Sequence, residues 1–560
     1  MRGSGRVRGR VARERWRRWV GLLSAALALT VALAGCGGSG GASNAGGSGQ
    51  GTAAGSGAPQ NGGTVTIPIV ADPTFNPWHP NAYVESVFVN RVLFDGLTKP
   101  GKDLSPAPDL ATSWEPSKDG LSWTFHLRQG VQWHDGQPFT ADDVAFTFDQ
   151  IVLNPKLAAN GASYFKAVKD VVAVDPSTVV FHLNRPFAAL PAYLAYNAGI
   201  LPKHIFEGKD PWTLASFNKE HPVGTGPFML QSYTPGQDVV LVRNPDYFGG
   251  APHLDKLVFK ILPDPNAQLA QALSNEITIF TLDDKSAVDR VKAAKNLVIR
   301  PETQVQFYWL ALNQANPLFT DVRVRQAILY AIDRKAIIAS VEKGYATVAN
   351  APISPALKKY YDPSLAGLYP YDPAKARQLL AEAGWTQTNA DGVLVKDGKP
   401  FHFVLDVGLK GDVLPVSQLV QQYLRKVGID AQLNSMEWNA FIQKDVVQRS
   451  YDATINWWVY PADPDVLPFF ISSAAGKGNN IPGYKDAKLD QLLVAGEQTS
   501  DPQARVEVYR RLQQYMAQTL PYVFLWFPQE VQVRNVRLHG VPDLGLRDAM
   551  EYVNEWWLSK

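Results

Sequence analysis

One structural element ends and the next begins within Leu127-Arg128-Gln129-Gly130-Val131-Gln132-Trp133-His134-Asp135-Gly136-Gln137-Pro138-Phe139-Thr140-Ala141-Asp142-Asp143-Val144. Just before it, residues 121–127 alternate apolar and polar side chains, which is typical of a half-buried β-strand. Thr140 and Asp143 have the spacing of a capping box, in which two side chains satisfy free N–H groups at a helix start. The stretch therefore predicts a strand, a turn and a helix in that order.

Strand and helix patterns are mixed along the rest of the chain. Residues 64–69 alternate polar and apolar, and Pro68 there suits the edge of a sheet. Apolar side chains at helical spacing predict a helix over 321–341, and another runs from Asp372-Pro373 to a stop at Gly384. Further strands are expected at 178–183, 239–242, 257–261, 307–312, 401–407 and 522–527. This order predicts an α/β protein with more than one lobe.

The first 35 residues have the composition of an export signal. Eight arginines and one glutamate precede a short apolar run, Trp19 to Ala34, which is shorter than the roughly 20 residues that span a bilayer. Leu33-Ala34-Gly35-Cys36 resembles a bacterial lipobox, so we expect cleavage before Cys36 and a lipid on its thiol. Cys36 is the only cysteine, so the lipid would leave no free reactive thiol.

Residues 36–63 are expected to form a tether, because twelve glycines fill positions 37–63 and such a segment cannot bury apolar surface. Without residues 1–35 the 54 basic and 52 acidic side chains become 46 and 51. The remaining chain is thus slightly acidic, and nothing in it indicates the basic surface that binds nucleic acid.

The patterns of common enzymes and metal sites do not occur in the sequence. No two of the nine histidines lie four residues apart, and there is neither a phosphate-binding loop nor a dinucleotide fingerprint. Cys36 is the only candidate thiol ligand. We therefore expect no enzyme, no metal and no cofactor, and an enzyme whose catalytic residues follow no motif is the alternative.

Several motifs together resemble the dipeptide/oligopeptide class of ABC solute-binding proteins, family 5. They are the stretch 127–144 quoted above, Val223-Gly224-Thr225-Gly226-Pro227-Phe228, Asp321-Val322-Arg323-Val324-Arg325-Gln326-Ala327 with Ala331-Ile332-Asp333-Arg334, and Tyr371-Asp372-Pro373-Ala374-Lys375-Ala376. The resemblance implies an extracytoplasmic monomer that captures a small solute for a membrane permease and its ATPase. The membrane would be reached through lipidated Cys36.

The resemblance also implies a two-lobed clamp with an extra domain. Lobe I would comprise residues 64–102, 223–304 and 528–560, the inserted domain II residues 103–222, and lobe II residues 305–527. Two crossing segments, near 304 and 527, would form the hinge.

Ligand-binding residues are suggested by alignment with the family pocket. Trp438, Trp458 and Trp526 match pocket aromatics, which bury much area and tolerate varied ligands. Tyr460 and Asp463 follow Trp458 closely. We expect these five side chains to line the cleft.

One family feature is missing from this sequence. Peptide binders of the family hold the ligand's amino terminus with an aspartate three residues after the second tryptophan, and counting from Trp458 gives Pro461. Asp463 offers a carboxylate nearby, although Asp463-Pro464 is also a common turn starter. The expected ligand is a peptide, with an oligosaccharide, an opine or a metal chelate as alternatives. A sensor or adhesin built on the same clamp is a further one.

Overall fold

The strand pattern of residues 64–69 corresponds to an edge strand of a four-stranded sheet. The computed structural model describes residues 58–82, 84–196 and 199–560. The sheet has the order β1-β10-β9-β8 and is called the β1 sheet. Its strands are β1 (Thr64–Ile69), β10 (Lys256–Ile261), β9 (Asp238–Arg243) and β8 (Phe228–Thr234). Pro68 lies in the edge strand, where its missing N–H costs no ladder bond.

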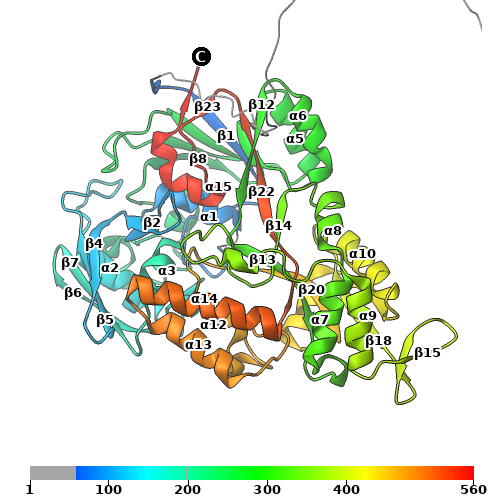
Figure 1. Ribbon diagram of the computed structural model, residues 1–560. Coiled ribbons are helices and arrows are strands. Elements are labelled where there is room, and N and C mark those ends of the chain that lie inside the picture. The colour runs from blue at the N-terminus through cyan, green and yellow to red at the C-terminus, as the bar shows by residue number, and fades with distance from the viewer. Residues whose placement is uncertain (1–57, 83, 197–198) are drawn as a thin grey trace, which may run out of the picture. The chain divides into compact units, whose positions relative to one another are not determined.

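A second sheet surrounds the ten-residue strand β22, and we call it the β22 sheet. Its order is β11-β22-β12, and β14 pairs with the first part of β22. The strands are β22 (Trp526–Asn535), β12 (Leu297–Thr303), β11 (Ile279–Thr281) and β14 (Ala346–Val348). In Figure 1, β12 and β22 run side by side down the middle of the view toward β13.

The third large sheet contains the two strands that matter most for the site, and we call it the β20 sheet. Its order is β19-β18-β20-β13-β21. The strands are β13 (Gln306–Leu312), β18 (His402–Gly408), β19 (Asp430–Met436), β20 (Ala453–Val459) and β21 (Val523–Phe524). Helix α10 (Val413–Arg425) packs on β18 and β19, and α7 (Val322–Ala331) packs on α9 (Pro373–Glu382).

A fourth sheet, of order β4-β5-β7-β6, carries the quoted stretch. Its strands are β4 (Ala111–Pro116), β5 (Ser122–Leu127), β6 (Val168–Asp175) and β7 (Thr178–Leu183). Helix α2 (Ala141–Ala145) follows, with the N–H of Thr140 bonded to the Asp143 carboxylate at 3.0 Å. The expected strand, turn and capped helix are therefore present.

The turn between them ties this sheet to the Gly224 motif. His134 accepts the N–H of Gly224 on Nδ1 at 3.1 Å and donates from Nε2 to the carbonyl of Gly226 at 3.0 Å. A Cβ at Gly224 would lie 1.8 Å from the carbonyl oxygen of Leu93, so only glycine fits. The turn that contains His134 and the Gly224 motif, both of which resemble the family, are therefore fixed to each other by hydrogen bonds.

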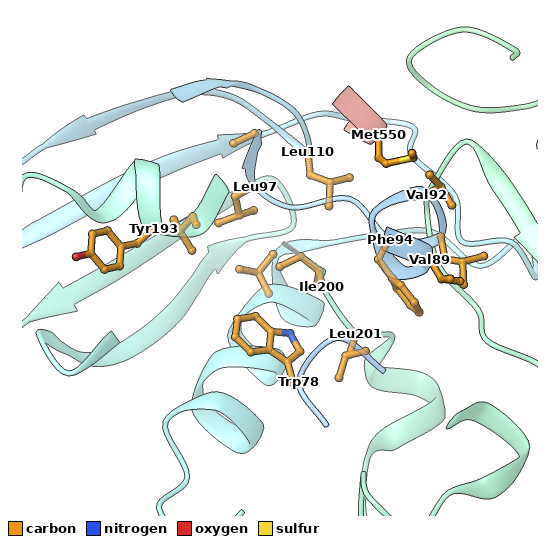
Figure 2. Packing of buried hydrophobic residues seen from close by; sticks show 14 of the residues in the cluster. Trp78, Val89, Val92, Phe94, Leu97, Leu110, Tyr193, Ile200, Leu201 and Met550 are labelled. Carbon is orange, nitrogen blue, oxygen red and sulfur yellow. The ribbon is translucent and has the colours of Figure 1, made fainter. Parts of the chain in front are cut away.

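Two apolar cores fill most of the described protein. One unites the β1 sheet with the fourth sheet, and Figure 2 shows Trp78, Phe94, Leu97 and Leu201 converging within it. The other lies around the β20 sheet and its helices. Burial of this apolar surface is the main force that holds these layers together.

The remaining elements are short or cover the sheets. The other strands are β2 (Thr98–Pro100), β3 (Pro106–Pro108), β15 (Gln387–Thr388), β16 (Leu394–Lys396), β17 (Lys399–Pro400), β23 (Leu538–His539) and β24 (Trp557–Leu558). The other helices are α1 (Val84–Leu93), α3 (Leu190–Tyr196), α4 (Lys203–Phe206), α5 (Pro265–Leu273), α6 (Val288–Ala293), α8 (Arg334–Ser340), α11 (Trp438–Phe441), α12 (Leu467–Phe470), α13 (Ala487–Gln498), α14 (Pro502–Thr519) and α15 (Leu546–Ala549).

Two sequence predictions differ from the structure in detail. The helix expected over 321–341 is two helices, because Asp333 leaves helical geometry and accepts the N–H of Ala336 as the cap of α8. The strand expected over 522–527 is divided between β21 and β22, which belong to different sheets. The helix from Asp372 is confirmed, with Gly384 in the left-handed region beyond its end.

The predicted fold class is confirmed, since helices and several mixed sheets alternate along the chain. The domain boundaries stay a prediction. The export signal, Cys36 and the tether up to residue 57 lie outside the described residues. Within the part of the chain that is described, we find no helix long and apolar enough to cross a membrane.

Candidate functional site

A cavity of about 750 Å³ lies where the β22 and β20 sheets approach each other. Its walls come from the chain crossing between β12 and β13, the end of β20, the loop before α15, and two loops near residues 103 and 161. This volume is in the range of small-molecule and peptide-sized sites. The cavity is therefore the candidate binding site.

The register of β13 against β20 decides which side chains of these strands share a face. Gln306 lies opposite Val459, and Tyr308 lies opposite Trp457. Gln306 and Val459 line the cavity. Because side chains two residues apart point the same way, Tyr308 and Trp457 continue the cavity face along the strands.

Four aromatic rings stack on that face, and we call them the aromatic column: Trp526, Tyr308, Trp457 and Trp438. Successive ring centroids are 5.1, 5.5 and 5.5 Å apart, with interplanar angles of 20°, 30° and 16°. The ammonium of Lys410 lies 4.8 Å from the Trp438 ring. None of the four is among the residues that line the cavity, and Trp526 is fully buried. The assignment of Trp438 and Trp526 to the ligand site stays a prediction.

Trp458 points to the opposite face of β20. It lies opposite the fully buried Phe307, and its ring stacks on Phe469 at 4.8 Å. Its indole N–H donates to the hydroxyl of Tyr522 at 3.3 Å. The structure therefore gives Trp458 a packing position, and Trp457 lies on the other face of β20, the face from which Val459 lines the cavity.

Tyr460 lines the cavity with only a small part of its surface. The side chain is 1% exposed, and its hydroxyl donates to the carbonyl of Pro352 and accepts the N–H of Ser354, both at 2.9 Å. Burial raises the pKa of this hydroxyl. Tyr460 therefore shapes the wall and carries no charge into the cavity.

Asp463 is not placed to receive a ligand. Arg505 donates to both of its carboxylate oxygens at 2.7 Å, and the two side chains are almost fully buried. The Nε of Arg505 also donates to the carbonyl of Gly496. Asp463 is thus held in a buried ion pair and is not among the residues that line the cavity.

Acidic side chains concentrate on the β22 side of the cavity. Glu302, Glu530, Asp543 and Asp548 all line it. Arg547 compensates Asp548 at 3.0 Å. Burial opposes ionisation of Asp548, yet Arg547 and Arg91 together hold its pKa below its usual value. No local sequence pattern indicates this wall, because β12, β22 and the loop before α15 are far apart in the chain.

A resident metal ion is not indicated by the geometry. In residues 58–560 with their short gaps, no three histidine, cysteine or acidic side chains converge as a metal site would need. The cavity is lined by tyrosines and by both acidic and basic side chains, the basic ones being Lys102, Lys358 and Arg547. Such a mixed lining suits recognition of an organic solute.

Comparison with known proteins gives the family. Residues 105–480 match the bacterial extracellular solute-binding proteins, family 5, over its middle region. The chain belongs to this family. It is a solute-binding component of an ABC transporter and not an enzyme, as the motifs indicated.

Three relatives show the range of the family. The oligopeptide-binding protein AppA of Bacillus subtilis is 32% identical over 96% of this chain and 98% of its own length. Its structure with a nonapeptide covers 90% of this chain and 100% of that chain, with a TM-score of 0.74. Heme-binding protein A of Haemophilus influenzae is 30% identical, over 79% of this chain and 82% of its own. NikZ of Campylobacter jejuni, solved with Ni(L-His), is 30% identical, over 88% and 99% of the chains, with a TM-score of 0.73.

Proposed function

We propose that this protein captures peptides outside the cell, tethered through a lipid on Cys36, and delivers them to an ABC permease. The relative from Bacillus subtilis, of which this chain covers 98%, is an oligopeptide-binding protein. The family alone does not decide the ligand, since other members bind heme or a nickel–histidine complex. The argument for a peptide therefore rests on the cavity itself.

The observation that carries the proposal is an open strand edge at the cavity. Strand β18 pairs with β20 only at Ala453 and Thr454. Among the described strands, residues 455–459 of β20 pair with β13 alone. A half-open strand beside a cavity is suited to binding an extended peptide by main-chain hydrogen bonds.

The backbone of β20 is oriented for such pairing. The N–H of Trp457 donates to the side chain of Asn456 at 2.8 Å instead of to β13. In an antiparallel pair, residues alternate between bonding the partner strand and facing away from it. Val459, two residues on, therefore has its N–H and C=O on the same open edge, and its side chain lines the cavity.

The aromatic column supplies the second half of the recognition. Two of its rings, Trp438 and Trp457, keep part of their surface exposed, and aromatic surface of low side-chain entropy accepts different ligand side chains. An oligosaccharide stacked on the same rings is the alternative solute, because sugar faces also pack on tryptophan. Main-chain pairing at β20 distinguishes a peptide from an oligosaccharide, because this pairing needs peptide N–H groups in the ligand.

Native mass spectrometry of gently purified protein identifies a co-purified solute. The sharper test is calorimetric titration with the recovered peptide, N-methylated at one position at a time. A peptide that pairs with β20 through one of its edges should lose affinity when every second residue is N-methylated. N-methylation of the residues between them should leave the affinity unchanged. Uniform tolerance, or a recovered oligosaccharide, would contradict the peptide proposal.

A further inference from the structure

Two glutamates face each other directly across the β22 sheet. Glu302 on β12 is the register partner of Glu530 on β22, and both line the cavity. Like charges at directly opposite positions destabilise an antiparallel pair. The pairing of two glutamates does not stabilise the sheet, so this pair indicates a role in the cavity.

The two carboxylates differ in what holds them. Glu530 accepts hydrogen bonds from the N–H of Leu546 at 2.8 Å, the hydroxyl of Thr281 at 3.1 Å and the amide of Gln304 at 3.0 Å. Glu302 makes no hydrogen bond or ion pair with any other described residue by the usual distance criteria. Glu530 is thus built into the wall, and Glu302 is available to a ligand.

The surroundings of Glu302 favour a positive partner. Burial raises the pKa of its carboxyl to about 7, and the charge of Asp543 adds to the effect. The charge of Arg534 lowers the pKa of Glu302, the charge of Glu530 raises it, and the charge of Arg300 lowers it. A cation bound in the cavity would remove part of this penalty and return the pKa toward its ordinary value.

The β20 wall supplies no competing acid, and the carboxylate of Asp103 on a third wall accepts hydrogen bonds from Ser105. Counting three residues from Trp457, the tryptophan on the cavity face, gives Tyr460, and counting from Trp458 gives Pro461. Neither side chain carries a charge, and Asp463 is occupied by Arg505. The N–H of Tyr460 donates to the carbonyl of Val305, three residues after Glu302, so this wall and the acidic wall meet at the same crossing.

We propose that Glu302 selects ligands with a cationic group and binds that group as its counter-charge, the ammonium of a peptide being the expected case. The inference rests on the proposed function of the same cavity and adds to it a specificity residue from the β22 sheet. A charged hydrogen bond in a partly buried site corresponds to a preference of about tenfold to hundredfold for ligands with the cationic group over ligands without it.

The test uses the full-length protein and its Glu302→Gln variant. Each is mixed with a pool of tetrapeptides with free amino termini and with the same pool N-acetylated, and bound species are measured by native mass spectrometry. The wild type should prefer the free-amine pool by tenfold or more. Glu302→Gln should reduce the preference to within about twofold, Glu302→Asp should keep part of it, and Asp289→Asn, an exposed acid on α6, should not change it.

A second readout needs no ligand. Because an ionised Glu302 faces Glu530, Glu302→Gln should raise the melting temperature above that of the wild type at pH 8 and less so at pH 6. A fall in melting temperature at both pH values would mean a structural role and would overturn the proposal.

The outcomes distinguish this inference from the peptide proposal. If the wild type binds both peptide pools equally, or if Glu302→Gln keeps the preference, Glu302 is not the selective residue while peptide binding stands. If neither pool binds but putrescine does, and Glu302→Gln loses it, the cation assignment holds and the peptide proposal fails. Binding of neutral oligosaccharides alone would overturn both.

Discussion

The hydroxyl of Tyr193 on α3 donates a hydrogen bond to Asp465, 2.9 Å away and 272 positions later in the chain. Beside it, Arg185 binds both carboxylate oxygens of Glu497 at 3.1 and 2.9 Å. These contacts join the segment predicted as the inserted domain to the segment predicted as lobe II. They hold the two segments together in the form of the protein described here.

Asp465 gives this junction a pH dependence. Burial raises the pKa of its carboxyl to about 7, and the charges of Asp463 and Glu497 raise it further, while the hydrogen bond from Tyr193 opposes them. The folded chain therefore keeps a proton that the unfolded chain releases above about pH 4. Stability from this group is present at low pH and is lost as pH rises toward 7.

We expect Asp465→Asn to flatten the decline of melting temperature between pH 5 and pH 8, because the amide has no proton to lose. Thermal melts across this range measure it, with the exposed Asp391→Asn as the matched control. Parallel curves for wild type and Asp465→Asn would show that Asp465 does not titrate in this window.

Reversing the charge at Arg185 should separate the two segments. Arg185→Glu places a carboxylate against Glu497, so we expect a larger radius of gyration by small-angle scattering and weaker ligand binding. Glu497→Arg in the same chain should restore both. Ligand added to the wild type should not enlarge the radius, since contacts from both walls favour the closed form.

The adjacent tryptophans of β20 should respond in opposite ways. Trp457→Ala removes a ring of the aromatic column, and loss of about 2 kcal/mol should weaken binding roughly thirtyfold with little change in the melting temperature. Trp458→Ala leaves a gap against Phe469, so we expect a loss of about 3 kcal/mol in unfolding free energy. Calorimetric titration and denaturant unfolding on both variants separate the roles, and equal effects would contradict the assigned faces.

The buried pair of Asp463 and Arg505 should behave as a structural element. Asp463→Asn leaves the guanidinium of Arg505 without its counter-charge, and breaking one partner of a buried pair costs about 3–5 kcal/mol. Urea unfolding should therefore show a large drop, while folded Asp463→Asn protein keeps its preference between free-amine and acetylated peptides. Selective loss of free-amine peptides would instead make Asp463 the amine anchor.

Membrane attachment is predicted to depend on Cys36. One acyl chain binds a membrane only marginally, whereas two hold it stably, so Cys36→Ser should move the protein to the soluble fraction. Fractionation after a salt wash measures this. Retention of the variant in the membrane would mean that residues 19–34 anchor the protein themselves.

The sequence alone determined the fold class, most strands, the capped helices and the family. These follow from local patterns, such as the alternation in 64–69 and the Asp372 cap, which act over a few residues and survive in any context. The motifs predicted a binding protein instead of an enzyme, and family membership bears this out. Alignment with the family predicts Trp438 and Trp526 as ligand-binding residues, and that assignment stays a prediction.

Only the tertiary structure decided which side chains face the cavity. Trp457 and Trp458 are adjacent and chemically identical, and a shift of one residue moves a side chain to the other face of the sheet. Three contacts that shape the site and its surroundings join distant positions. Asp463 and Arg505 are 42 residues apart, Glu302 and Glu530 are 228 apart, and Tyr193 and Asp465 are 272 apart. No local pattern encodes such pairings, because they arise when separate sheets pack together.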